Sequence, residues 1–294
     1  MRSLAIVFPV YNGLAYTKKC IEVLEKALDR EKDNLTAYIT VVDDGSTDNT
    51  GAWLREHRPN VHVLQGDGSL WWSGGMNEGM QYAFDQLNVD YVLCWNNDVV
   101  AADDYFTKLV QIINSNGDAG LVCSKVMCLG TDEIFAFGCY FNKYTGLAKI
   151  NGYGQKETEE RYMRNTPVDW AGGMGTLIPR EIYKKIGLFD NRNFPQYRGD
   201  CDYYLRAKKA GYSITAHFDL RIWNDLGNSV GKSGVDDRRL GSLKELLTST
   251  RSHYNFKVFM RFMLKHGFFT AWFISPVVTY AKLCRVLLKN GIKR

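Results

Sequence analysis

The sequence predicts an α/β fold, in which a sheet of mainly parallel strands is covered by helices and a helical extension follows at the C-terminal end. The first observation is that short apolar runs alternate with stretches of helical spacing through the first hundred residues, which is typical of such a sheet. The second is that three of these runs stop at polar turns, namely Tyr11-Asn12, Asp43-Asp44 and Asn96-Asn97-Asp98. Ligands bind beyond the carboxyl ends of strands in open α/β sheets, so these turns are candidate binding positions.

The elements of the first half follow from this alternation. Residues 4–10 form an apolar run that ends in a turn, and residues 16–28 place their apolar side chains at helical spacing. Residues 37–42 read as a strand, and Ser46 or Thr47 can cap a helix over 47–56. The same reasoning predicts a strand at 61–64, a helix at 75–87 and a strand at 91–95.

After residue 100 the alternation weakens. We expect a helix over 104–114 and a strand over 120–128, whereas residues 133–170 are rich in Gly and Tyr and show no clear period. Short helices are expected at 182–186 and 201–210, and residues 224–243 form a polar loop. From Ser242 onward the sequence is helical and increasingly apolar.

Charge is distributed unevenly along the chain. The first 245 residues hold 28 basic and 32 acidic side chains, whereas Leu246 to Arg294 hold nine Lys and Arg and no Asp or Glu. Aromatic residues are interleaved with these basic ones, a pattern that favours contact with a membrane surface. The uncharged stretch from Gly267 to Ala281, with Pro276 inside it, is shorter than the ~20 residues that span a bilayer. The alternative is that the tail docks on the core or forms a homodimer interface, and no nucleic-acid-binding motif accompanies its charge.

Cysteine usage and the N-terminal sequence bear on location. The seven Cys include no CxxC pair, which indicates free thiols in a reducing compartment. The first apolar run is too short for a signal peptide and leads directly into the first strand. We therefore expect a cytoplasmic protein, peripheral on the inner face of the cytoplasmic membrane if the tail binds lipid.

Two adjacent carboxylates, Asp43 and Asp44, end the second predicted strand. A carboxylate only accepts hydrogen bonds, so the pair suits the N–H of a base and the hydroxyls of a ribose. The alternative is a turn that caps the following helix. No GxGxxG motif follows the first strand, so a dinucleotide-dependent dehydrogenase is not expected.

Two glycine-containing segments have both a functional and a structural interpretation. Residues 66–80 combine glycines with Trp71 and Trp72 at the start of a helix, whose N-terminus favours an anion such as a diphosphate. The Trp pair and Asn77 can equally serve packing or capping. Residues 171–175, followed by 176–181, read as a flexible hinge that leads into a helix, where glycine leaves room for an acceptor or a moving loop; the alternative is a tight turn.

Asp98 follows a buried apolar run and stands beside two amide side chains. Oxygen ligands of this kind suit Mg²⁺ or Mn²⁺ shared with substrate phosphates. A second acidic pair, Asp200 and Asp202, begins a helix, where negative charge is favoured for structural reasons alone. The functional alternative is that Asp200 is a general base, while Asp202 pairs with Arg206 one turn later.

Six motifs in a fixed order carry a family resemblance: VFPVYNG, VVDDGSTD, LWWSGGMNEGM, CWNNDV, AGGMGTLIPREIYKKIGLFD and GDCDYYLRAKKAG. They resemble the family 2 glycosyltransferases of the GT-A fold, and more narrowly the bacterial rhamnosyltransferase-like branch that builds surface polysaccharides. The resemblance extends from residue 3 to about residue 230. It implies a catalytic domain over 1–235, with a nucleotide-binding half (1–100) and an acceptor half (101–235), followed by the extension 236–294.

The resemblance also implies roles for individual residues. The base and ribose of a nucleotide-sugar would contact Pro9, Tyr11, Asp43 and Asp44. The donor side of the site would include Gly74, Asn77, Asn96 and Asn97. The transferred sugar and the acceptor would lie near Trp170, Gly172, Gly173 and Asp202. Asp98 would be the metal carboxylate, with Mn²⁺ or Mg²⁺ as cofactor, and Asp200 the catalytic base.

Three positions depart from the family pattern. Asn96 stands where the first Asp of the metal-binding "DxD" is usual, and Gly199 stands where the Glu of the "ED" pair is usual. Many relatives have a His after the last sheet strand, and here Asn224 or Asp225 occupies that region. Either of them could take over a contact with the metal or the diphosphate.

The implied function is a single inverting displacement that moves a sugar from a UDP- or dTDP-linked donor to a hydroxyl of a glycan or lipid-linked acceptor. This function leads us to expect that Asp44, Asp98 and Asp200 converge on one cavity. A sugar nucleotidyltransferase would need a basic, Gly-rich loop after the first strand, which this sequence does not supply. A non-catalytic nucleotide-sugar-binding scaffold is the other alternative, and the substitutions at Asn96 and Gly199 favour it.

Overall fold

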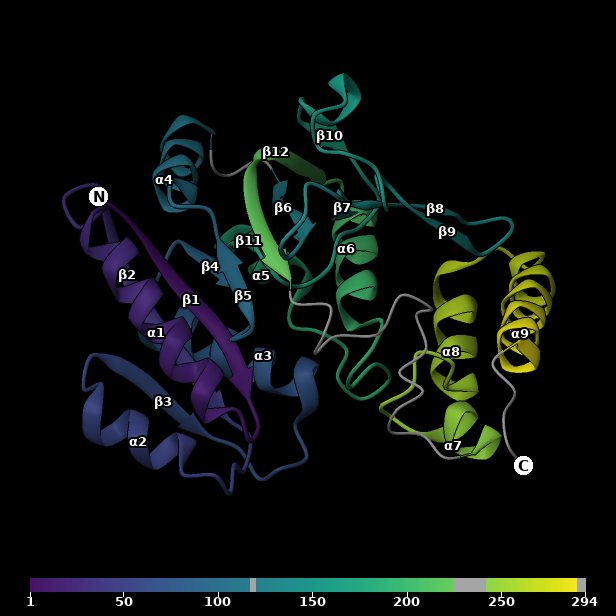
Figure 1. Ribbon diagram of the computed structural model, residues 1–294, viewed down its shortest axis with the longest axis horizontal. Coiled ribbons are helices and arrows are strands. Elements are labelled where there is room, and N and C mark those ends of the chain that lie inside the picture. The colour runs from purple at the N-terminus through teal and green to yellow at the C-terminus, as the bar shows by residue number, and fades with distance from the viewer. Residues whose placement is uncertain (117–119, 225–241, 290–294) are drawn as a thin grey trace.

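A mixed ten-stranded sheet runs through the centre of the molecule, and helices cover both of its faces (Figure 1). The computed structural model describes residues 1–116, 120–224 and 242–289. The strand order is β10-β12-β6-β11-β4-β1-β2-β3, with β5 beside β12 and β7 beside β6. In chain order the strands of this sheet are β1 (Arg2–Val10), β2 (Leu35–Asp43), β3 (Val61–Gln65), β4 (Tyr91–Cys94), β5 (Val99–Ala101), β6 (Gly120–Cys128), β7 (Ile134–Ala136), β10 (Thr166–Pro167), β11 (Thr176–Pro179) and β12 (Ser213–Asn224).

The four strands β3, β2, β1 and β4 are parallel, as the alternating sequence predicts. The sheet becomes mixed at β11, which lies antiparallel to both β4 and β6. A separate two-stranded hairpin is formed by β8 (Cys139–Asn142) and β9 (Leu147–Ile150). The parallel half brings the carboxyl ends of β1, β2 and β4 to one edge of the sheet.

Two hydrophobic cores, one on each face of the sheet, hold the helices in place. In β1, Leu4, Ile6 and Phe8 belong to one core, whereas Ala5 and Val7 belong to the other. This explains why the strand is apolar throughout, since both of its faces are covered. The first core packs α1 (Leu14–Asp29), α2 (Thr50–His57) and α4 (Tyr105–Asn116); the second packs α3 (Trp71–Gln81), the π-helix η1 (Tyr82–Gln86), α5 (Arg180–Ile186), α6 (Gly199–Lys209) and α8 (Phe256–His266).

The structure confirms the predicted fold class, and it also adds elements that the sequence pattern does not reveal. Residues 133–170, which lack a period, contain β7 to β10 and the short 3₁₀ helix η2 (Glu160–Tyr162), all between two and four residues long. Residues 176–179, which we expected to lead from a hinge into a helix, form the buried strand β11. Strands this short carry no readable alternation. The domain boundary expected at 235 and 236 lies outside the described residues.

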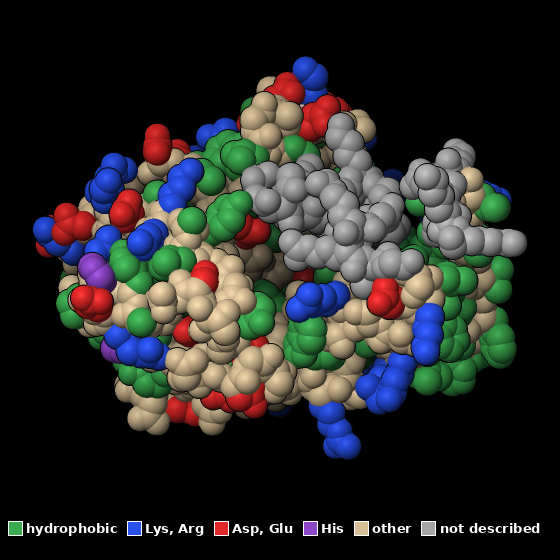
Figure 2. Space-filling view, turned by 60° about the horizontal axis from the view of Figure 1, so that its bottom comes forward, with side chains coloured by type: hydrophobic (Ala, Val, Ile, Leu, Met, Phe, Trp, Pro, Cys, Tyr) green, Lys and Arg blue, Asp and Glu red, His purple; other side chains and the backbone are tan. Residues whose placement is uncertain are grey.

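The C-terminal extension consists of α7 (Leu243–Thr248), α8 and α9 (Ala271–Lys289). Helix α8 docks on the α/β body, because Phe259, Phe262 and Met263 belong to the same core as α3 and α6. Helix α9 is mostly exposed, and Phe273 and Val277 each keep 69% of their surface accessible. Hydrophobic side chains gather at this end of the molecule, which lies on the right in Figure 2.

Candidate active site

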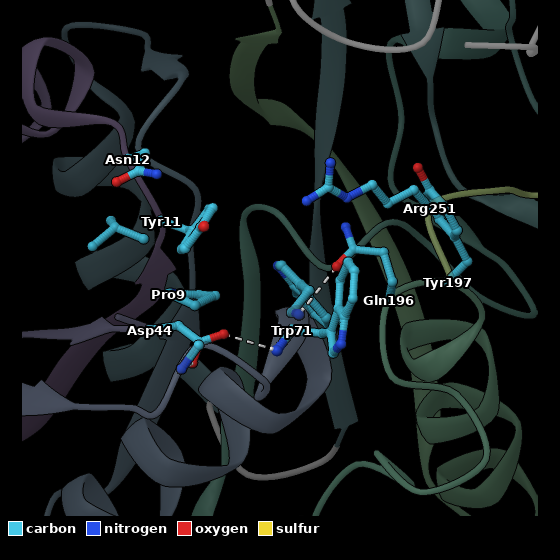
Figure 3. A pocket seen from close by; sticks show the side chains of 11 residues that line it. Pro9, Tyr11, Asn12, Asp44, Trp71, Gln196, Tyr197 and Arg251 are labelled. Carbon is cyan, nitrogen blue, oxygen red and sulfur yellow. Dashed lines mark hydrogen bonds between the residues drawn. The ribbon is translucent and has the colours of Figure 1, made fainter. Parts of the chain in front are cut away.

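A cavity of about 530 Å³ opens at the carboxyl ends of β1 and β2. The wall on the β-sheet side contains Pro9, Tyr11 and Asp44, three of the residues that we expected to contact the nucleotide (Figure 3). The loop that leads into α3 contributes Trp71 and Trp72. The opposite wall comes from the loop before α6 and from the segment between α7 and α8, so the cavity joins parts of the chain that are far apart in sequence.

Asp44 organises the loop that leads into α3. Its Oδ1 accepts hydrogen bonds from the N–H groups of Gly68 at 2.8 Å and Leu70 at 3.3 Å, and its Oδ2 accepts one from Trp71 at 3.1 Å. Trp71 has a φ of 57°, a left-handed conformation that is uncommon outside glycine. Because a carboxylate has about four acceptor positions, Asp44 retains capacity for a donor group of a ligand.

Asp43 has a different role from its neighbour. Its side chain is buried, and its Oδ1 accepts a hydrogen bond from the N–H of Ser46 at 3.0 Å. Its Oδ2 would lie 2.0 Å from a Cβ placed on Gly51 in the first turn of α2. Asp43 therefore holds the turn and packs against α2, and it is not among the residues that line the first cavity, so its expected contact with a nucleotide stays a prediction.

Trp72 connects three segments at the rim of the cavity. Its indole N–H donates to Oδ1 of Asn96 at 3.1 Å, and its backbone N–H donates to Oε1 of Gln196 at 3.2 Å. A Cβ on Gly173 would come within 2.2 Å of the indole ring, so the chain at Gly173 passes directly against Trp72. Trp72 thus does more than pack its own helix, because it brings Asn96 and Gly173 next to the cavity.

Asp200 lies in the first turn of α6, behind Gly173. Its Oδ1 accepts a hydrogen bond from the N–H of Cys201 at 2.7 Å. Burial raises the pKa of the Asp200 carboxyl, and backbone hydrogen bonds from Cys201 and Gly173 oppose the rise. The side chain retains partial exposure. A carboxylate with a raised pKa is better suited to accept a proton near neutral pH than an ordinary one.

Asp98 faces a different part of the molecule. It lines a second cavity of about 160 Å³ between α1 and β5, together with Asn97 and the buried residues Cys20 and Trp95. Burial raises the pKa of Cys20 to about 12, and the nearby negative charge of Asp98 adds to the rise. The Asn97 side chain donates to Oγ1 of Thr17 in α1 at 3.0 Å, which keeps the turn after β4 directed toward that helix.

The three carboxylates expected to converge do not line one cavity. Asp44 lines the first cavity, Asp98 the second, and Asp200 lies behind Gly173. Asn224 ends β12 opposite Val99, one residue from Asp98, and Asp225 lies outside the described residues. Within the described ranges, no three His, Cys, Asp or Glu side chains come together as a metal site.

Several residues expected near the sugar or the donor make contacts within the fold. The Asp202 carboxylate is fully buried and pairs with Arg206, Lys265 and His266, which join α6 to α8. These partners lower the pKa of Asp202 to about 2 against the opposing effect of burial. The intrahelical pair with Arg206 is therefore confirmed, whereas a sugar contact by Asp202 would require a buried carboxylate to leave three basic groups.

Asn77, Gly74 and Trp170 are also engaged by their own surroundings. Asn77 donates to the carbonyl oxygen of Phe189 at 2.9 Å and accepts from its N–H at 2.8 Å. A Cβ on Gly74 would lie 3.2 Å from the Cβ of Leu70, so this glycine permits close packing inside α3. Trp170 is buried and packs against the rings of Phe141 and Phe262. Gly172 borders open space, with no atom within 4 Å of a Cβ placed on it.

Sequence reasoning gave no individual role to Asn12, Gln196, Tyr197 or Arg251, which also line the first cavity. The Asn12 side chain accepts a hydrogen bond from the N–H of Thr47 at 2.7 Å, which joins the turns after β1 and β2. The place of Asn12 in the cavity could have been predicted, because it is a polar residue directly after the first strand. The place of Arg251 could not, because it depends on how the extension folds back onto the body.

The sheet and the cavity at its carboxyl edge together define a protein of the GT-A glycosyltransferase fold. The protein-family model for "Glycosyl transferase family 2" matches residues 5–187, and the chain belongs to this family.

Among curated proteins, the chain is similar to the low-salt glycan biosynthesis hexosyltransferase Agl10 of Haloferax volcanii. The two are 24% identical over 182 residues, which cover 60% of this chain and 55% of Agl10. It is also similar to an uncharacterized glycosyltransferase of Rickettsia typhi, with 23% identity over 74% of this chain and 61% of the relative. The chain thus spans only slightly more than half the length of these relatives.

Three solved structures share the fold at low sequence identity. GalNAc-T7 with UDP, GalNAc and Mn²⁺ gives a TM-score of 0.58 at 14% identity, over 76% of this chain and 44% of that protein. The mannosyltransferase PcManGT of Pyrobaculum calidifontis with GDP-Man and Mn²⁺ gives a TM-score of 0.53 at 16% identity, over 78% of this chain and 58% of that protein. TarS 1–349 of S. aureus with UDP gives a TM-score of 0.52 at 16% identity, over 76% of this chain and 60% of that protein.

Proposed function

We propose that this protein transfers a sugar from a nucleotide-diphosphate sugar to an acceptor hydroxyl with inversion at the anomeric carbon. The observation that carries the proposal is the cavity at the carboxyl ends of β1 and β2, lined by Pro9, Tyr11 and Asp44, in a family 2 chain. Ligands of open α/β sheets bind at this edge. The solved neighbours that contain UDP or GDP-Man support a nucleotide-sugar as the donor.

The nucleoside would lie against the sheet-side wall. Tyr11 is 55% exposed and can stack on a base, and Asp44 can accept hydrogen bonds from a ribose hydroxyl or a base N–H. The sugar would then extend past Trp72 toward Gly173, because these two residues form the rim nearest to Asp200. This direction puts the transferred group next to the proposed base.

In the proposed step, a carboxylate oxygen of Asp200 takes the proton of the acceptor hydroxyl. The acceptor oxygen forms a bond to the anomeric carbon while the bond from that carbon to the diphosphate oxygen breaks, and the nucleoside diphosphate leaves with the bonding electron pair. The raised pKa of Asp200 supports its assignment as the base. Access to Asp200 requires the chain at Gly173 to make room, and Gly172 beside it borders open space.

A divalent cation would supply charge stabilisation for the leaving diphosphate, as Mn²⁺ in two of the solved neighbours suggests. The described residues fit this group only in part. Asp98 offers one carboxylate near Asn224, but it lines the second cavity and is separated from Asp44. We therefore assign no step to a cation, and either Mn²⁺ or Mg²⁺ could serve if substrate phosphates complete the ligand set.

We further propose that the reaction belongs to the synthesis of a bacterial surface polysaccharide, with a UDP- or dTDP-linked sugar of the rhamnosyl or another hexosyl type. The sequence resemblance to the rhamnosyltransferase-like branch supports this assignment. The similarity to a hexosyltransferase of glycan biosynthesis supports the broader class.

A lipid-linked acceptor would be reached from the membrane surface, and α9 is suited to lie there. Phe269, Trp272 and Phe273 are exposed on or next to α9, and Lys282 and Arg285 are exposed on the same helix. The helix is long and apolar enough to span a bilayer by length and composition, over Ala271–Leu288, although Pro276 lies within it. An interfacial orientation agrees with the interleaved basic residues.

A basic groove beside this helix supports an anionic surface as the target. The groove, of about 1040 Å³, lies between the β8–β9 hairpin and the end of α6 and contains Lys143, Lys149, Lys208 and Lys209. The N–H of Phe268 donates to the carbonyl oxygen of Lys143 at 2.6 Å, so the hairpin and the turn before α9 are joined. Anionic headgroups would be attracted to these lysines.

The proposed function is tested with nucleotide-sugars on the intact chain. Nucleotide binding is measured by calorimetry with UDP, dTDP and GDP, and release of the nucleoside diphosphate is measured with the matching sugar donors, with and without Mn²⁺. We expect one nucleotide to bind and its sugar conjugate to be hydrolysed or transferred. Tight binding without turnover would indicate a scaffold, and the absence of any binding would overturn the proposal.

A further inference from the structure

The first cavity holds one basic side chain among the described residues that line it, and this residue comes from the C-terminal extension. Asp44 gives the sheet-side wall a negative charge, whereas Arg251 lies across from it (Figure 3). A nucleoside diphosphate carries more negative charge than its nucleoside, so a cavity that contains a carboxylate needs a cation to favour the diphosphate. Arg251 lies beyond the region that matches the family description, which ends at residue 187.

The segment between α7 and α8 is held in one conformation by its own hydrogen bonds. The Asn255 side chain donates to the carbonyl oxygens of Thr248 at 2.8 Å and Ser249 at 3.1 Å, and it accepts from the N–H of Val258 as the cap of α8. The N–H of Arg251 donates to Oγ of Ser249 at 3.1 Å. Since α8 is anchored in the core, the backbone of Arg251 is fixed relative to the catalytic body.

Two ring contacts place this segment against the cavity. The rings of His253 and Tyr197 lie 3.6 Å apart between centroids, which joins the segment to the loop before α6. The guanidinium of Arg251 lies 5.7 Å from the centroid of the Trp71 ring, within the range of a cation–π contact. Trp71 is the residue whose N–H is held by Asp44, so Arg251 lies next to the loop that Asp44 organises.

We propose that Arg251 binds the diphosphate of the nucleotide-sugar and so makes the C-terminal extension part of the donor site. This inference rests on the proposed function. The residue is exposed and its guanidinium lies over the ring of Trp71. Among the described residues the guanidinium makes no hydrogen bond or ion pair, which leaves its N–H groups available. The planar guanidinium matches phosphate oxygens in a bidentate manner. With the nucleoside against Tyr11 and Asp44, the diphosphate spans the cavity toward Arg251.

The experiment compares nucleoside and nucleoside diphosphate affinities for the intact chain and its variants. Calorimetry is carried out with the pairs uridine and UDP, thymidine and dTDP, and guanosine and GDP, with EDTA and then with Mn²⁺. One of these nucleoside diphosphates is expected to bind the wild-type chain. We expect Arg251→Ala to lower the affinity for that nucleoside diphosphate by about 10- to 100-fold, the range for the loss of charged hydrogen bonds. The affinity for the nucleoside should change less than about twofold. Arg251→Lys should give an intermediate loss of diphosphate affinity, because it keeps the positive charge but not the planar, bidentate guanidinium.

Arg285→Ala is the matched control, since it removes an exposed arginine from the same extension away from the cavity. It should leave both affinities unchanged, and melting temperatures should show that all variants are folded. Unchanged diphosphate affinity in Arg251→Ala would overturn the inference while leaving the proposed function intact. Equal losses for nucleoside and diphosphate would also overturn it, because Arg251 would then act by supporting Trp71. Failure of the wild-type chain to bind any nucleotide would overturn the proposed function itself.

Discussion

The indole ring of Trp72 lies so close to Gly173 that a Cβ at Gly173 would be 2.2 Å from the ring. This contact fixes the start of α3 against the segment that leads into β11. Gly173 also makes a backbone hydrogen bond to the carboxylate of Asp200, the proposed base. If the donor lies as proposed, the pair of Trp72 and Gly173 should affect both the packing of the site and the approach of the acceptor to Asp200.

Gly173→Ala should destabilise the protein, because the added methyl would overlap the half-buried ring of Trp72, whose position is held by its hydrogen bond to Asn96. We expect a loss of about 1–3 kcal/mol in the free energy of unfolding, measured by urea denaturation. Gly172→Ala is the matched control, since a Cβ there meets no atom within 4 Å. Equal stability of the two variants would contradict the prediction, because it would show that the Trp72 ring moves aside for the methyl group without a cost in stability.

Asp44→Asn should disorder the loop that leads into α3 and weaken nucleotide binding. The amide keeps one acceptor oxygen but presents an N–H₂ group to an N–H of Gly68 or Trp71, which leaves a backbone donor without its acceptor. Loss of a charged acceptor costs about 1.5–3 kcal/mol, so affinity for the nucleotide should fall by at least tenfold in calorimetry. Asp33→Asn, on an exposed position far from the cavity, should bind normally.

Asp200→Asn should abolish sugar transfer but leave donor binding intact. An amide cannot accept the acceptor proton, and such a base contributes ~10²–10⁴-fold to the rate. In the wild-type chain, activity should decline as the pH falls through the raised pKa of Asp200, because the base becomes protonated. Single-turnover assays and calorimetry on the same samples measure rate and affinity separately. Near-normal transfer by the variant would remove Asp200 from the mechanism.

Asp202 should make stability depend on acid pH. Its folded pKa of about 2 lies below its ordinary value of 3.8, so its contribution is fully present above about pH 4 and is lost as the pH falls toward 2. The shift corresponds to about 2 kcal/mol. Urea denaturation at pH 6 and pH 2.5 should show this loss in the wild type, whereas Asp202→Asn should be less stable at pH 6 and lack that part of the pH dependence. A variant with the same pH profile as the wild type would contradict the assignment.

Membrane binding should depend on the exposed aromatic side chains near α9. The double change Phe269→Asp and Phe273→Asp replaces two rings that are 57% and 69% exposed with charges. We expect sedimentation with vesicles of phosphatidylglycerol to fall by at least tenfold, because burial of each ring and the attraction to anionic lipid are both reduced. Met163→Asp, at a hydrophobic position 56% exposed outside the extension, is the control. Equal sedimentation of the double variant and the control would exclude this surface as the contact.

Much of the fold could be predicted from sequence because its signals are local. The apolar run that becomes β1 serves two cores, and the turns after β1 and β2 contain the polar residues that line the cavity. Asp44 could be assigned to the site for the same reason. Strand β11 could not be predicted, since four buried residues have no alternation and its antiparallel pairing depends on β4 and β6.

The rest of the site depends on contacts between distant segments. Whether Asp43 or Asp44 faces the cavity is decided by the position of α2, and Asp98 turns toward α1 because its neighbour Asn97 bonds to Thr17. The sequence could predict the pair of Asp202 with Arg206, but not its pairs with Lys265 and His266, which come from α8. Charge spacing along one helix cannot reveal partners that come from another part of the chain.

The burial of Phe262 has a consequence for how the protein acquires its structure. Its ring contacts Trp170 and Phe194, and its core also contains Ala5 of the first strand. During synthesis, α8 can complete this core only after more than 250 residues that follow Ala5 have left the ribosome. Such late closure exposes apolar surface on the nascent chain for many seconds, so we expect the protein to rely on chaperones and to complete its folding only after translation has passed α8.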